Sequence, residues 1–188
     1  MTETEFYALI DAARPSATPN TQSADPDALR EVLSQLPDDE VAAFATEFRR
    51  QLVRLNRWSL WDAGYAASGG LGDDAFHYFR SWLIGKGAGV VDVALTDPEM
   101  LVPYLDTEEL ENELLEYVAE EVLDDRGIDE DDDADVVFTD GEPAGQRFDE
   151  ETSEERHPKL AAWWAEVSGG LRLDDDALVV ESEPDGHL

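Results

Sequence analysis

The 188-residue chain contains no cysteine, only two methionines and three histidines, and few basic residues. Without cysteine it can form no disulfide framework, thiolate zinc site, iron–sulfur cluster or cysteine nucleophile. No apolar run approaches the roughly 18 residues of a membrane span, and the first residues are acidic where a signal peptide would be basic. We therefore expect a cytoplasmic protein without a membrane segment.

The 13 basic residues face 46 acidic ones, which gives a net charge of −33 at pH 7. Residues 101–188 hold 30 of the acids and five of the bases, so the second half carries most of the charge. Such a field repels nucleic acids and anionic lipids and attracts basic protein surfaces. We expect no direct nucleic-acid or membrane binding, and a basic protein is a candidate partner. Solubility or adaptation to a salty cytoplasm is the simpler explanation of the acidity.

What the chain does contain is enough apolar material for a core, with 42% hydrophobic residues, among them five Trp, five Tyr and seven Phe. These residues recur at helical spacing in segments that end at Pro or Gly. The segment 37–68 is either one helix or two with a bend near Asn56. The pattern predicts helices over about 2–14, 25–36, 37–68, 73–84, 89–97, 106–127 and 157–170, with a short turn at 98–105.

The sequence therefore predicts an all-α fold, an irregular bundle of about seven or eight helices. Residues 1–168 form the predicted helical domain, with an acidic, turn-rich loop at 128–156 and one short strand within it at 135–139. Residues 171–188 are expected to form an acidic C-terminal tail or a short hairpin. Trp163 and Trp164 indicate that the last helix docks onto the body.

The acidic loop has some spacing of a calcium-binding EF-hand. Acids occupy positions 1, 3, 5 and 7 of such a loop: Asp129, Asp131, Asp133 and Asp135. Position 6, which requires glycine, is Ala134, and position 12, which requires glutamate, is Asp140. No helix follows. A solvated acidic loop fits these residues better than a metal site, so we expect no metal here.

The stretch GGLGDDAFHYFRSWLIGKG, residues 69–87, gathers polar groups on a predicted helix. Asp74, His77 and Arg80 are its candidate catalytic residues, because a histidine with a carboxylate and a guanidinium nearby suits proton transfer. Candidate ligand-binding residues come from this helix and the one before it: Trp61, Tyr65, Asp73 and Tyr78.

A structural interpretation of the same stretch is simpler. Asp73 or Asp74 caps the helix and complements its dipole, while His77 lies beside a core stripe of Phe76, Phe79 and Leu83. The glycines do not follow a strand, and the chain has no P-loop, dinucleotide fingerprint or G-x-S-x-G motif. We expect no cofactor, and these absences favour a non-enzymatic role.

Three segments together resemble a bacterial family known as domain of unknown function 4240: TEFYALIDAAR, RWSLWDAGYAASGGLGDDAFHYFRSWLIGKG and ALTDPEML. The resemblance covers about residues 1–127, and the EPAG and HPKLAAWW segments extend it to about 168. It departs at AGYAA, where the family usually has a larger residue after the tyrosine, and in the tail from Leu171. The resemblance implies an α-helical domain and no known activity, so it supplies no catalytic residue.

Three functions remain open at this point. The first is a non-enzymatic protein–protein interaction module, adaptor or immunity-like, that presents an acidic surface to a basic partner. The second is an enzyme or small-ligand binder with a site around Asp73, Asp74, His77 and Arg80. The third is a mimic of nucleic-acid charge that occupies a basic groove. The second function predicts a pocket in which His77 and an aspartate side chain converge.

Overall fold

The computed structural model describes residues 1–15, 22–105, 110–128 and 141–176, with side chains as far as Gly169. The described part forms nine α-helices, three 3-10 helices and no strand. The all-α prediction is therefore confirmed, with slightly more helices than expected. The candidate EF-hand residues Asp129, Asp131, Asp133 and Asp135 lie outside the described residues, as do the short strand predicted at 135–139 and the end of the tail, 177–188.

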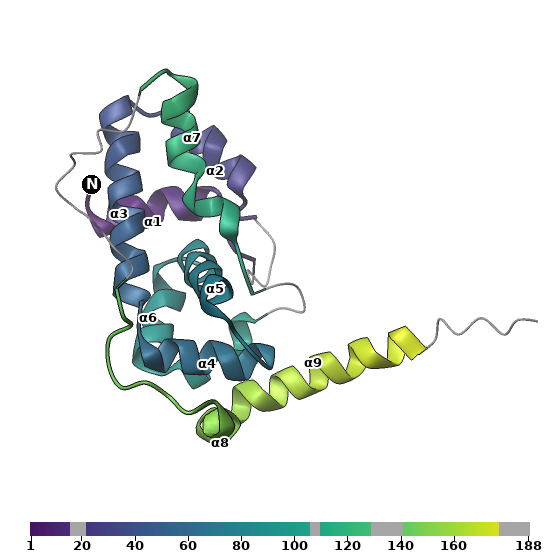
Figure 1. The fold of residues 1–188 in the computed structure, drawn as a ribbon. Helices are drawn as coiled ribbons and strands as arrows, with labels where there is room; N and C mark the ends of the chain where they lie inside the picture. The colour runs from purple at the N-terminus through teal and green to yellow at the C-terminus, as the bar shows by residue number, and fades with distance from the viewer. Residues whose placement is uncertain (16–21, 106–109, 129–140, 177–188) are drawn as a thin grey trace, which may run out of the picture.

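In Figure 1, α5 lies in the middle of the body, and it packs against α1, α3, α4, α6 and η2. In Figure 1, α3 runs along one side of α5, α4 lies at one end, and α2 and α7 lie at the other. No helix in the described part of the chain combines the length and the apolar character needed to cross a membrane. In chain order the helices are α1 (Glu3–Ala12), α2 (Pro26–Leu33), α3 (Asp38–Leu55), α4 (Trp58–Ser68), α5 (Asp73–Gly85), α6 (Ala88–Thr96), η1 (Pro98–Tyr104), η2 (Glu113–Glu116), α7 (Val118–Asp125), η3 (Glu150–Thr152), α8 (Ser153–Arg156) and α9 (Pro158–Asp176).

Local sequence sets several helix ends. Thr2 accepts a hydrogen bond from the backbone of Glu5, whose side chain accepts one from the backbone of Thr2, which completes a capping box at α1. Asp25 caps α2, with proline at the first helical position. The segment 37–68 is two helices, because the backbone leaves the helical conformation at Asn56.

The core of the described part is one continuous apolar cluster. Phe6, Phe44 and Phe48 pack α1 against α3, with ring centroids 4.8 to 6.2 Å apart. Phe76 and Leu83, both on the stripe predicted for α5, are at most 2% exposed. Because burying such a side chain contributes about 1.5–3 kcal/mol, this stripe holds α5 in the middle of the body and orients its other face.

The prediction of one helix over 106–127 is wrong for the residues described. The chain forms η2 and then α7, and the backbone at Asn112 is not helical. The N–H of Asn112 donates to the carbonyl of Tyr78, and its side-chain amide donates to Ser23 Oγ and the Ala24 carbonyl. These tertiary hydrogen bonds outweigh the helical propensity of the segment, and they place η2 against α5.

The last helix, α9, docks on α4 as its two tryptophans predicted. Leu160 is fully buried, Trp163 packs against the core, and the Trp164 indole lies beside Gly69, the left-handed residue that ends α4. The helix then continues past its glycine pair to Asp176 and projects away from the body (Figure 1). Glycine in a helix costs only about 1 kcal/mol, so the pair does not end α9 where the sequence predicts a tail.

Candidate functional site

The candidate residues of α5 are carried by a helix whose N-cap is a glycine. Gly72 has an extended backbone, and its carbonyl accepts the N–H of Phe76 at 2.8 Å. The prediction that Asp73 or Asp74 caps the helix is therefore wrong, because both lie in its first turn. Both side chains are exposed there, and their charges complement the positive end of the helix dipole.

A cleft of about 570 Å³ opens beside this first turn, and we call it the α5 cleft. Its volume lies within the range of about 300–1,000 Å³ that is usual for small-ligand sites. Most of the side chains proposed from the sequence line it: Trp61, Asp73, Asp74, His77, Tyr78 and Arg80. Segments remote in sequence supply most of the rest of the wall: Asn56, Glu116, Tyr117 and residues 141–143. A pocket thus lies beside the candidate residues, and the carboxylate that contacts His77 in it belongs to Glu116 and not to an aspartate.

Tyr65 is not part of this wall. It lies four residues beyond Trp61, about 6 Å further along α4, and its ring contacts Phe148 with centroids 5.8 Å apart. The α5 cleft therefore does not bring Tyr65 together with the α5 residues. Phe148 comes from a segment that the sequence pattern did not connect with α4.

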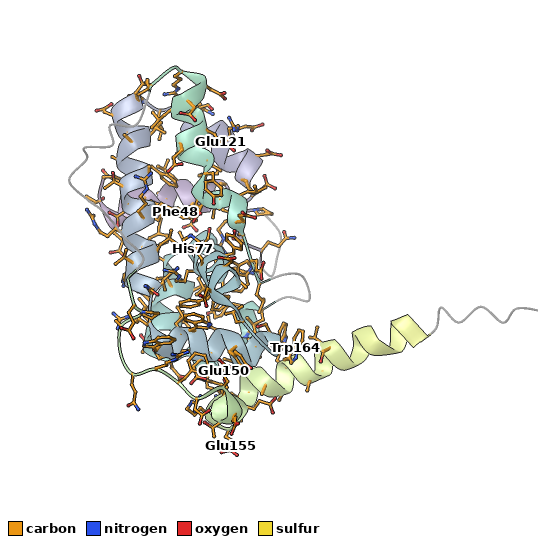
Figure 2. All side chains as sticks on the ribbon, in the orientation of Figure 1. Phe48, His77, Glu121, Glu150, Glu155 and Trp164 are labelled. Carbon is orange, nitrogen blue, oxygen red and sulfur yellow. The ribbon has the colours of Figure 1, made fainter. Side chains whose placement is uncertain are left out.

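His77 is held between two charged side chains. Its Nε2 lies 2.5 Å from Oε2 of Glu116, and its Nδ1 lies 3.0 Å from Nη2 of Arg80. A guanidinium can only donate hydrogen bonds, so Nδ1 accepts and the imidazole proton sits on Nε2, toward the carboxylate. Figure 2 shows His77 near the middle of the molecule, close to Phe48 of α3.

Arg80 connects α5 to α3. Its side chain is buried, and Nη1 donates to the carbonyl of Leu52 at 3.1 Å. The guanidinium also lies over the ring of Phe76, 4.9 Å from the centroid. A buried charge requires partners of this kind. Arg80 therefore orients His77 from the buried part of the cleft wall.

Two phenols in the wall donate to carboxylates. Tyr78 donates to Oε1 of Glu113 at 2.9 Å, and this hydrogen bond raises the pKa of Tyr78 to about 12. A hydrogen bond to Glu116 likewise raises the pKa of Tyr117 above its ordinary value. Both phenols stay protonated at neutral pH, so they act as hydrogen-bonding groups and not as bases.

Stacked aromatic rings form the wall of the cleft on the α4 side. Trp61 lies between Trp58 and Phe76, with ring centroids 5.1 and 4.7 Å away and planes within 10° of parallel. Arg147 lies over Trp58 at one end of this column, and Arg80 lies over Phe76 at the other. Both faces of Trp61 are therefore covered.

The segment 141–148 crosses the junction of α3 and α4. Asn56 donates from its side chain to the Gly141 carbonyl at 2.8 Å and accepts the N–H of Ala144 at 2.9 Å. The N–H of Trp58 donates to the Ala144 carbonyl at 3.0 Å. In Figure 1 this green segment runs along the outside of the body from α3 to α8. These hydrogen bonds bring Glu142 to the cleft.

A second polar cluster fastens α8 and α9 to α4. Asp62 is buried and receives two hydrogen bonds from Arg156, at 2.6 and 2.9 Å, and one from Ser153 at 2.7 Å. Nε2 of His157 lies 3.2 Å from the same carboxylate. Burial opposes ionisation, but the hydrogen bonds from Arg156 and Ser153 outweigh it and lower the pKa of Asp62. These contacts join α4 to α8 and α9.

The sequence pattern did not identify Glu113, Glu116, Tyr117 or Glu142 as site residues. Glu113, Glu116 and Tyr117 lie 35 or more positions from the α5 residues that they face, and Glu142 comes from a loop. The i, i+3 spacing of Glu113 and Glu116 was a usable signal, since it places both on one side of a helical turn. Among the described residues, no group of three or more His, Asp or Glu is arranged to share a metal ion.

A family model described as Protein of unknown function (DUF4240) matches residues 1–125. The chain belongs to this family. In this DUF4240 protein the match includes all the described residues of the α5 cleft wall except 141–143, and it ends short of the position near 168 that the sequence resemblance predicts. Comparisons with curated proteins and with solved structures gave no match.

Proposed function

We propose that the protein is a binding protein and not an enzyme, and that its α5 cleft receives a basic group of a partner protein. The observation that carries this proposal is the charge of the cleft wall. Among the described residues, four carboxylates line it, those of Asp73, Asp74, Glu116 and Glu142, against the single guanidinium of Arg80. Arg80 is buried against α3, so the solvent side of the cleft is negative and attracts a cation.

The aromatic wall favours a cation that donates hydrogen bonds. A quaternary ammonium is bound by exposed ring faces, whereas both faces of Trp61 are covered by other rings. Carboxylates form short, charge-assisted hydrogen bonds with ammonium and guanidinium groups. Asp73 and Asp74 are exposed and available for such bonds. The cleft therefore suits the side chain of lysine or arginine.

The contacts of His77 support binding over proton transfer. A general base needs a lone pair within hydrogen-bond reach of the substrate. Nδ1 of His77 faces Arg80 and Nε2 faces Glu116, so both ring nitrogens are engaged within the protein. In this arrangement His77 acts on the cleft by positioning the carboxylate of Glu116.

The net charge of −33 favours the same kind of partner at longer range, because a negative field speeds encounter with a basic protein. Mimicry of nucleic-acid charge, the third function considered from sequence, also requires a basic partner but needs no cleft. Neutralising carboxylates one pair at a time therefore separates the two proposals.

The test measures binding of N-acetyl-arginine amide to the full chain by two-dimensional NMR, with tetramethylammonium as the quaternary comparison. We expect the arginine derivative to shift backbone signals of α5 and the indole N–H signal of Trp61, and tetramethylammonium to leave them in place. We expect the variant Asp73→Asn/Asp74→Asn to weaken binding about tenfold, since two exposed ion pairs contribute roughly 1.4 kcal/mol together.

The matched control is Asp39→Asn/Glu40→Gln. These acids are also exposed and also lie in the first turn of a helix, α3, but they do not line the α5 cleft. Binding should be unchanged in this variant. Equal weakening in both variants would assign the affinity to the overall charge, and undiminished binding in Asp73→Asn/Asp74→Asn would refute the proposal.

A further inference from the structure

A second hollow adjoins the α5 cleft. It has a volume of about 200 Å³, and we call it the α3 pocket because one face of α3 forms most of its wall. Three side chains, those of His77, Glu116 and Tyr117, line both hollows. The pair formed by His77 and Glu116 therefore separates two spaces that a single ligand can reach from the same surface.

One wall of the α3 pocket is apolar, and polar side chains form the rest of its lining. On its α3 side Ala45, Phe48, Leu52 and Val53 form an apolar wall. The charged side chains of the lining are paired, Arg49 with Glu120 and Glu116 with His77. Val53 is 41% exposed and Tyr117 is 37% exposed, which places two large hydrophobic side chains in contact with water at this pocket. Covering them with an apolar group removes that surface from water and is favourable.

We propose that one extended segment of the partner protein fills both hollows, with a lysine or arginine in the α5 cleft and a bulky apolar side chain two positions away in the α3 pocket. This inference rests on the proposed function and adds the sequence requirement of the partner. Charge complementarity selects the basic residue, and the apolar α3 wall beside the cleft selects the bulky apolar side chain.

The spacing of two positions follows from the wall between the hollows. Alternate side chains of an extended peptide point to the same side and lie about 6.6 Å apart along the chain. His77 and Glu116, one pair of contacting side chains, form the wall between the hollows. With that separation, one peptide side chain enters the cleft and the other enters the α3 pocket, on either side of this wall. Adjacent residues of an extended peptide point to opposite sides, so they cannot fill both hollows.

The test compares four blocked tripeptides, N-acetylated and C-amidated, by NMR titration of the full chain: Arg-Gly-Leu, Arg-Leu-Gly, Arg-Gly-Gly and Gly-Gly-Leu. We expect Arg-Gly-Leu to bind about tenfold more tightly than Arg-Gly-Gly, because the leucine side chain is removed from water. Arg-Leu-Gly should bind no better than Arg-Gly-Gly.

The variant Val53→Gln should abolish the tenfold advantage of Arg-Gly-Leu and leave Arg-Gly-Gly binding unchanged. Met100→Gln is its control, because Met100 is another exposed hydrophobic residue, at 50%, and lines neither hollow. Met100→Gln should keep the tenfold preference for Arg-Gly-Leu over Arg-Gly-Gly, as the unmodified chain does.

The outcomes separate this inference from the proposed function. Equal binding of Arg-Gly-Leu and Arg-Gly-Gly overturns the inference and leaves the basic-group site standing. Equal binding of Arg-Gly-Leu and Gly-Gly-Leu overturns the proposed function, since the arginine then contributes nothing. Tighter binding of Arg-Leu-Gly than of Arg-Gly-Leu overturns the spacing of two positions.

Discussion

Nε2 of His77 and Oε2 of Glu116 lie 2.5 Å apart although 39 positions separate the two residues in the chain. The contact joins α5 to η2 and lies between the α5 cleft and the α3 pocket. Arg80 on the other side of the imidazole determines which nitrogen carries the proton. One hydrogen bond thus links the packing of the core to the shape of the proposed binding surface.

A double-mutant cycle with His77→Gln and Glu116→Gln should give a coupling of about 1 kcal/mol in the free energy of unfolding. A hydrogen bond to a charged group contributes about 1.5–3 kcal/mol, and partial exposure of both side chains, 27% and 14%, reduces it. Urea unfolding of the four proteins measures the coupling. The exposed pair Arg30 and Glu121, treated in the same way, should give less than about 0.5 kcal/mol; equal couplings would contradict the prediction.

Asp62→Asn should lower the free energy of unfolding by about 3 kcal/mol, because it removes the charged partner of Arg156 from a buried position. The loss should be greatest where α8 and α9 meet α4, since Asp62 joins these elements. Urea unfolding gives the overall change, and hydrogen exchange shows where protection is lost. Asp38→Asn, which affects the exposed pair with Arg126, should cost less than about 1 kcal/mol.

The contribution of Asp62 to the free energy of unfolding should also depend on pH, and it should only decrease as the pH falls. The folded state lowers the pKa of this carboxyl, so its contribution is full above the unfolded value of about 3.9 and is lost as the pH falls through the folded value. The stability difference between the natural chain and Asp62→Asn should therefore be constant near neutral pH and shrink below about pH 4. A stability difference that grows as the pH falls would contradict this prediction.

Gly69→Ala should destabilise the protein by about 1–2 kcal/mol or more. Gly69 has a φ of 68°, a conformation that costs a residue with a Cβ about 1–2 kcal/mol, and a Cβ there would lie 2.2 Å from Nε1 of Trp164. Thermal unfolding measures the loss, and tryptophan fluorescence reports displacement of the indole. Gly89→Ala, in α6 with open space around it, should be neutral or stabilising; a similar loss there would contradict this explanation.

The periodicity of the sequence was sufficient to predict most of the long helices and the α5 side of the cleft. Asp73, His77 and Arg80 follow one another at spacings of four and three residues, so any helix over this stretch brings them to one side. The apolar stripe at Phe76 and Leu83 predicted which face is buried. These conclusions hold because helix geometry is local and repeats every 3.6 residues.

Only the tertiary structure decided what faces that side of α5. The hydrogen bonds of Asn112 interrupt a strongly helical sequence and bring Glu116 to His77, while Asn56 holds Glu142 at the cleft through the backbone of its loop. Each of these contacts joins residues more than 30 positions apart and depends on how whole helix faces pack together. Local spacing therefore determined which residues α5 presents, and the packing of the body determined the carboxylates that surround them.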